Sequence, residues 1–141
     1  MHPWLVSLLL LASAARAADP DPGSLYVVST EGSTTSLRPG QPGTFVLSIR
    51  TVPGAHVSDE APLKLLLAGS GGVQPAKATL GRADAKAVQK GSGPADPRFE
   101  VSFAMAGKGP GALEAKLTFF VCTDTLCSRQ QKTLSVPVTV D

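Results

Sequence analysis

The chain has 141 residues, of which 43% are hydrophobic and 17% are charged, and its formal net charge at pH 7 is +2. Proteins that bind nucleic acid or anionic membranes need a basic face, so a charge this close to neutral argues against both classes of partner. The length suits a single domain that can bury a real core.

Residues 1–17 have the features of a secretory signal peptide. Residues 4–12 form an apolar run of h-region length, far short of the ~20 residues that span a bilayer, and Ala15-Arg16-Ala17 matches an A-x-A cleavage site. Only the α-amino group and His2 supply positive charge before this run. We therefore predict export, to a periplasm or out of the cell, with cleavage near Ala17. No later segment is long and apolar enough to cross a membrane, so no membrane span is predicted in the mature chain.

The mature chain begins with a lead, residues 18–24, whose aspartates and prolines predict an extended and mobile segment. The predicted domain, residues 25–141, opens with two strands. Residues 25–30 predict a short strand at a sheet edge, and residues 44–51 alternate apolar and polar side chains as a half-buried strand does. Dense proline and glycine in residues 37–43 predict a turn between the two strands.

The middle of the domain contains shorter and less regular segments. Residues 52–62 form a long connection that includes His56, the only histidine of the mature chain. Residues 63–68 are an almost continuous apolar run, which predicts a buried strand that a glycine-rich stretch then ends. Residues 76–80 predict a further strand, whereas residues 82–90 fit either a short helical turn or a strand.

Three further strands are predicted near the C-terminus, over residues 98–105, 112–122 and 132–140, because apolar and polar side chains alternate in each. No long segment with helical periodicity is present, and the strands follow one another at intervals of roughly eight to twelve residues. These features predict an all-β protein, an immunoglobulin-like antiparallel β-sandwich whose C-terminal hairpin contains a disulfide. The spacing of the cysteines does not fit the bridge between sheets that antibody domains have.

The only two cysteines, Cys122 and Cys127, lie at the tip of this hairpin, and in an exported chain they are expected to form a disulfide. Pairing them across the hairpin fixes its antiparallel register. Apolar side chains then meet apolar side chains, with Leu113 opposite Val136 and Ala115 opposite Leu134. A slip of one residue would turn one apolar face to water, so the cysteine pairing and the hydrophobic pattern support each other.

The hairpin also resembles a known family. The run Leu117-Thr-Phe-Phe-Val-Cys-Thr-Asp-Thr-Leu-Cys127, with the alternating Leu134-Ser-Val-Pro-Val-Thr-Val140 after it, is similar to the end of the N-terminal periplasmic domain of DsbD-type thiol:disulfide interchange proteins. Gly54-Ala55-His56-Val57 is similar to a Gly-x-His-x element of that family. The resemblance implies an immunoglobulin-like domain whose cysteine pair passes electrons between a membrane thiol:disulfide carrier and thioredoxin-fold proteins. The best-known members differ in cysteine spacing, C-x5-C, and have aromatic residues and proline after the second cysteine.

Two interpretations of the cysteine pair remain open. As a structural bond, the disulfide would stabilise the fold by roughly 2 kcal/mol on the chain-entropy model. As a redox pair, it would exchange with a partner's thiol, because the predicted register exposes both sulfurs on the polar face at the hairpin tip, where disulfides are exchangeable. Arg129 would favour a cysteine thiolate and Asp124 would oppose it, so the sequence shows no clearly activated nucleophile.

Four neighbouring residues have candidate roles beside the cysteines. Asp124 has the chemistry to transfer a proton to or from a departing sulfur, although aspartate in a short loop commonly accepts backbone hydrogen bonds instead. The register places Phe120 opposite Arg129. Its ring either has a functional role, in shielding the disulfide or contacting a partner, or packs on the aliphatic part of the Arg129 side chain as an ordinary cross-strand neighbour. His56 could approach the tip or be a solvated loop histidine.

The sequence gives no support to other chemistry. A hydrolase triad has little basis with one histidine and no G-x-S-x-G motif. The glycines of residues 69–72 lack the Lys-Ser/Thr of a phosphate-binding loop. A zinc site formed by the two cysteines and His56 has no evident fourth ligand, so neither a metal nor a cofactor is predicted. The two remaining classes of function are a thiol:disulfide exchange domain and a non-catalytic exported sandwich that binds a protein or supports an assembly.

Overall fold

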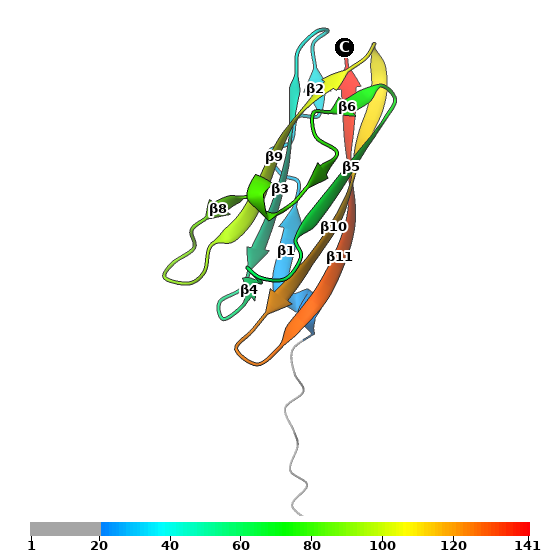
Figure 1. The fold of residues 1–141 in the computed structure, drawn as a ribbon. Helices are drawn as coiled ribbons and strands as arrows, with labels where there is room; N and C mark the ends of the chain where they lie inside the picture. The colour runs from blue at the N-terminus through cyan, green and yellow to red at the C-terminus, as the bar shows by residue number, and fades with distance from the viewer. Residues whose placement is uncertain (1–20) are drawn as a thin grey trace, which may run out of the picture.

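The computed structural model describes residues 21–141, which form a sandwich of two β-sheets (Figure 1). The predicted signal peptide lies outside the described residues. Sheet A has five strands and sheet B has six, and all pairings are antiparallel except that of β2 with β11. Sheet A contains β1 (Tyr26–Ser29), β3 (Gly43–Thr51), β6 (Val73–Pro75), β8 (Lys86–Val88) and β9 (Asp96–Met105). Sheet B contains β2 (Ser36–Leu37), β4 (His56–Val57), β5 (Lys64–Ser70), β7 (Thr79–Leu80), β10 (Gly109–Cys122) and β11 (Cys127–Val140). The predicted fold class is therefore confirmed.

The long hairpin of β10 and β11 is the main element of sheet B. Its strands pair continuously from Gly109 opposite Val140 to Cys122 opposite Cys127, which is the register that the sequence predicted. β10 lies between β11 and β5, so it is paired along most of both edges. A central strand of this kind holds the hairpin tip in a fixed position relative to the rest of the sandwich.

The core lies between the sheets and consists of the side chains that the alternation assigned to the apolar faces. From sheet A, β3 and β9 contribute Phe45, Phe99 and Phe103 to the core together with other apolar side chains. From sheet B, β10 and β11 contribute alternate residues. Its fully buried members of largest volume are Phe45, Phe99, Phe119, Leu47, Ile49, Leu65, Leu113, Leu117, Val121 and Val138. At about 25 cal/mol per Å² of apolar surface, this burial is the dominant stabilising contribution.

β5 differs from its prediction as a buried strand. Leu65 and Leu67 are buried, but Leu66 between them is 38% exposed, because sheet B has only one covered face. The strand also extends into the glycine-rich stretch that was expected to end it. Gly69 lies so close to β6 that a Cβ atom there would be 1.7 Å from the Val73 carbonyl oxygen, so no larger residue fits without a backbone shift.

Two short segments contain helical turns. Pro22–Ser24 forms a 3-10 helix in which the Asp21 carboxylate accepts a hydrogen bond from the Gly23 N–H. The lead was predicted to be extended, and in this part the prediction is wrong. Residues 82–90 combine both predicted alternatives, a 3-10 helix at Arg82–Asp84 and then β8. Neither they nor any other helix within residues 21–141 combines the length and apolar character that a membrane crossing needs.

Candidate functional site: the disulfide end of the sandwich

The hairpin tip, the turn between β3 and β4, and the loop between β8 and β9 meet at one end of the sandwich (Figure 1). At the tip, Cys122 and Cys127 form a disulfide with an S–S distance of 2.05 Å. The Thr123 N–H donates a hydrogen bond to the Leu126 carbonyl at 2.7 Å, which closes the loop between the cysteines. The predicted cysteine pairing is thus confirmed.

β4 places His56 beside the disulfide. In the register of β4 with β10, His56 lies directly opposite Cys122, and Cys122 is in turn opposite Cys127. Residues opposite one another in an antiparallel pair share a face of the sheet, with Cβ atoms about 4.5–5.5 Å apart. The structure therefore aligns His56 and the two cysteines across three strands on the outer face of sheet B. The sequence did not decide whether His56 lies near the hairpin tip or is a solvated loop histidine, and the structure places it at the tip.

Phe120 and Arg129 form the next line across the same face. They are opposite one another as predicted, and the Ser58 N–H donates to the Phe120 carbonyl at 2.9 Å, which fixes the start of the β4–β5 connection against β10. Phe120 is half-buried and Arg129 is exposed. Because Phe120 and Cys122 alternate with a buried valine, the ring lies beside the disulfide along the strand. Its roles in shielding or partner contact stay predictions.

The exposure of the two cysteines differs from the prediction. Both sulfurs were expected to be accessible, but Cys122 is only 2% exposed, whereas Cys127 is exposed. The physical reason is β4, a two-residue strand that the sequence did not predict, which pairs with the last two residues of β10 and places His56 beside Cys122. Approach from solvent is therefore open at the Cys127 end of the bond and closed at the Cys122 end.

A cavity of about 610 Å³ adjoins the tip. Asp124, in the hairpin loop, and His56 lie on its wall, so the structure brings these two predicted residues to one cavity. The remaining wall is formed by the β3–β4 turn and the β8–β9 loop, and consists of Thr51, Pro53, Gly54, Ala55, Lys90, Gly91, Ser92, Gly93 and Pro94. Asp124 itself is exposed. Its proposed transfer of a proton stays a prediction.

The walls of this cavity are joined by a buried polar network that the sequence analysis missed. Asp96, which is 5% exposed, accepts hydrogen bonds from the Thr51 hydroxyl at 2.6 Å and from the Thr51 N–H at 3.2 Å. The Lys90 ammonium lies 3.7 Å from the same carboxylate. It also donates to the Thr51 hydroxyl and carbonyl and to the Ala55 carbonyl, the last at 3.0 Å. A lysine in a polar loop gives no sequence signal of such a role.

Comparison with known proteins gives little further information. Neither a protein-family model nor a curated protein matches the sequence. Among solved structures, the chain is similar to AggA, the major subunit of aggregative adherence fimbriae type I from Escherichia coli, with a TM-score of 0.39 and 16% sequence identity over 82% of this chain and 94% of that chain. A likeness of this strength supports no inference about function, because proteins of unrelated function share sandwich architectures.

Proposed function

We propose that this protein is an exported, non-catalytic β-sandwich that binds another protein through its disulfide end, and that the disulfide is a structural bond holding the hairpin tip in shape. The burial of Cys122 is the observation that favours this function over thiol exchange. A disulfide that serves as an electron carrier has to be reached by a second protein's sulfur, and the burial of Cys122 beside β4 leaves only the Cys127 sulfur open to that attack. Export agrees with the bond itself, because disulfides persist in oxidising compartments.

The tip has the features of a binding surface. Leu126, between the two cysteines, is 44% exposed, and it is one of few large apolar side chains so exposed within residues 21–141. The cavity of about 610 Å³ lies on the same end of the molecule. A loop that is closed by a disulfide and fixed by a backbone hydrogen bond loses little conformational entropy when it is bound. These features support a preformed contact site for an apolar side chain of a protein partner.

Site-directed photo-crosslinking in the producing cells tests this function. A photo-reactive amino acid at position 126 is expected to crosslink to one discrete protein, and the same group at the exposed position 108, in the β9–β10 turn, is not. Leu126→Asp should abolish specific binding of the purified partner to the purified domain without lowering the midpoint of thermal unfolding. Equal crosslinking from both positions, or unchanged binding by Leu126→Asp, would contradict the proposal.

Thiol:disulfide exchange is a second candidate function, supported by the exposure of Cys127 and by the resemblance to the DsbD N-terminal domain. In this reaction a partner thiolate attacks the Cys127 sulfur, the disulfide breaks, and the Cys122 sulfur leaves as the thiolate. The product is a mixed disulfide between the partner and Cys127. A second thiol of the partner then resolves it, which leaves both cysteines reduced and the partner oxidised. Partners would be thioredoxin-fold proteins or a membrane thiol:disulfide carrier.

The unequal burial of the cysteines gives this candidate a specific test. Cys122→Ser leaves the exposed Cys127 free to trap a partner as a mixed disulfide, whereas Cys127→Ser leaves only the covered Cys122. Exchange predicts adducts with the first variant and few with the second, together with a reduction potential above about −300 mV, whereas structural disulfides have potentials below this value. A lower potential and no adduct from either variant would leave only the structural function.

A further inference from the structure

A second cavity, of about 540 Å³, lies on the outer face of sheet A, and the function proposed for the hairpin end does not use it. The face follows from the alternation of β3, in which Phe45, Leu47 and Ile49 point into the core, so that Ser48 and Arg50 point outward. The cavity is lined by parts of β1, β3, β8 and β9 and by the turn after β1. Its lining residues are Ser29, Glu31, Gly32, Ser48, Ile49, Arg50, Val88, Gln89, Lys90, Asp96, Pro97 and Arg98.

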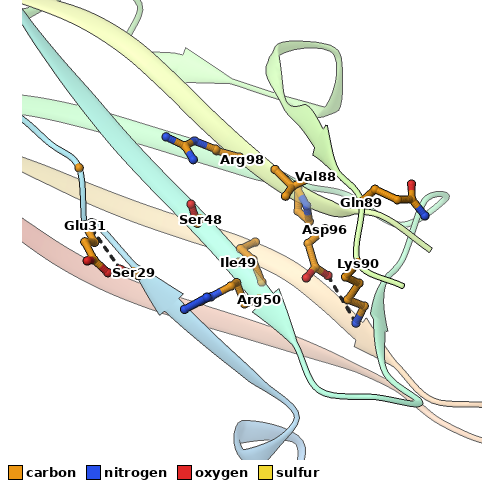
Figure 2. Close-up of a pocket in the computed structure, with 12 residues that line it drawn as sticks. Ser29, Glu31, Ser48, Ile49, Arg50, Val88, Gln89, Lys90, Asp96 and Arg98 are labelled. Carbon is orange, nitrogen blue, oxygen red and sulfur yellow. Dashed lines mark hydrogen bonds and ion pairs between the residues drawn. The ribbon is translucent and has the colours of Figure 1, made fainter. Parts of the chain in front are cut away.

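Two arginines from neighbouring strands lie on this face. Arg98 on β9 is directly opposite Ser48 on β3, and Arg50 is two residues further along β3. The arginines are therefore diagonal neighbours, a relationship in which Cα atoms lie about 7–8 Å apart, within reach of long side chains. Figure 2 shows the hydroxyl of Ser48 between the two guanidinium groups. A carboxylate placed here would meet donors of three side chains.

The charges of the lining are only partly compensated. Lys90 is 3.7 Å from Asp96, as described above, and the Arg98 Nε lies 3.2 Å from a Glu100 carboxylate oxygen in an ion pair. That Nε is buried and makes no hydrogen bond within residues 21–141. Arg50 is exposed. Within residues 21–141 it forms no ion pair with Glu31 or with any other acidic residue at 4.0 Å or less. An unpaired guanidinium beside a half-paired one gives the cavity a local preference for anions.

Apolar side chains flank the arginines. Val27 on β1 is directly opposite Arg50 and is 62% exposed, and Val88 on β8 is 45% exposed and lines the cavity. These are two of the four large apolar residues that are most exposed in the described chain. A free phosphate or a sugar acid would make no use of them. A peptide that contains an acidic residue between apolar residues would contact both the arginines and the valines.

We propose that this cavity binds an acidic segment of a partner protein, with a carboxylate between Arg50 and Arg98 and apolar neighbours of that carboxylate on Val27 and Val88. The Ser48 hydroxyl, which makes no hydrogen bond within residues 21–141, donates to the same carboxylate. The site lies on the opposite sheet from the disulfide and includes neither the cysteines nor Leu126, although Lys90 lines both cavities. A partner held at both places would contact two faces of the sandwich.

Nuclear magnetic resonance titration of the intact domain tests the proposal. The probe is the capped hexapeptide Gly-Val-Glu-Val-Glu-Gly, with Gly-Val-Gln-Val-Gln-Gly as its neutral counterpart. The acidic peptide is expected to shift the backbone amide signals of Ser48, Arg50, Val88 and Arg98, and the neutral peptide is not. Arg50→Gln should weaken the binding about tenfold, and binding should weaken further as salt is raised, since exposed charges are screened.

The matched control is Arg38→Gln, which removes the same charge from an exposed turn that does not line the cavity. Because Arg50 is exposed and unpaired, Arg50→Gln is expected to fold normally, and Val88→Ser provides a second variant that should weaken the peptide without changing charge. Equal weakening by Arg50→Gln and Arg38→Gln, equal shifts with the neutral peptide, or displacement of the peptide by an equal concentration of inorganic phosphate would overturn the proposal.

Discussion

Lys90 and Asp96 form an ion pair at 3.7 Å in which the aspartate side chain is 7% exposed and the lysine side chain 27% exposed. Around them, a hydroxyl and backbone carbonyls of Thr51 and Ala55 accept the remaining protons of the ammonium. The pair therefore fastens the loop after β8 to the turn after β3, and these two segments form most of the cavity beside the hairpin tip.

Lys90→Met should lower the free energy of unfolding by roughly 3 kcal/mol, because it leaves the Asp96 carboxylate buried without its cation. Urea denaturation at pH 7 measures the loss. The matched control is Lys86→Met, which breaks the exposed pair with Glu100, whose side chains are 67% and 33% exposed; it should cost at most about 1 kcal/mol. Equal effects of the two variants would show that the buried network contributes no more than a surface pair.

Replacing both cysteines, Cys122→Ala with Cys127→Ala, should lower the free energy of unfolding by about 2 kcal/mol, the loop-closure contribution of so short a cross-link. The fold should persist, because the register of the hairpin is also fixed by its apolar pairs, as in Leu113 opposite Val136. Circular dichroism and urea denaturation with and without dithiothreitol measure both effects. The oxidised wild type should lose the same amount on reduction, and the variant should not respond.

Tyr26→Phe should change how stability depends on alkaline pH. Burial, and secondarily the nearby charge of Asp21, raise the pKa of Tyr26 above its ordinary value of 10.0. The folded state thus holds the phenol proton more tightly than the unfolded state, so this contribution is present below pH 10.0 and is lost as pH rises through the folded-state pKa. The wild type should therefore lose more stability than Tyr26→Phe between pH 9 and about pH 11.

At neutral pH the same variant should be less stable by about 1 kcal/mol, because the Tyr26 hydroxyl donates to the Gln130 side-chain oxygen at 2.8 Å. The edge-to-face contact of Tyr26 with Phe119, at 4.8 Å between ring centroids, is kept by phenylalanine. Denaturation curves at several pH values separate the two effects. Parallel losses in wild type and variant above pH 10 would contradict the assignment to Tyr26.

Lys132→Val combined with Pro137→Val should make the protein self-associate. Within residues 21–141, most of β11 has no neighbouring strand along the edge that faces away from β10, since β2 pairs only with Thr139 and Val140. Pro137 removes an N–H from this edge, and the Lys132 ammonium lies 5.6 Å from the Tyr26 ring centroid, on the core-facing side of the strand. Prolines and inward-pointing lysines are devices that prevent edge-to-edge pairing.

Light scattering after size-exclusion chromatography, over a range of protein concentrations, measures this association. Lys116→Val is the control, because Lys116 is exposed on β10, which is paired on both sides. It adds an exposed valine without opening an edge and should leave the oligomeric state unchanged. Association of the control to the same extent would assign the effect to surface hydrophobicity and not to the edge of β11.

Much of the fold could be predicted because the side chains of a half-buried strand alternate. β3, β9, β10 and β11 all show this pattern, and their observed faces agree with it. The short strands were harder, because two or three residues contain too little alternation to detect. β4 was missed for this reason, and the apolar run of β5 was assigned to a buried strand because a run of leucines does not reveal that one face is open.

The amino-acid sequence by itself determined the hairpin, its register and the pairing of its cysteines, because a shift of one residue would have exposed an entire apolar face. Only the tertiary structure decided what surrounds that hairpin. Cys122 is buried beside β4, and hydrogen bonds join Lys90 and Asp96 to Thr51 at the end of β3. Both contacts join segments far apart in the chain and form only when the folded sandwich brings those segments together, which no local pattern of residues records.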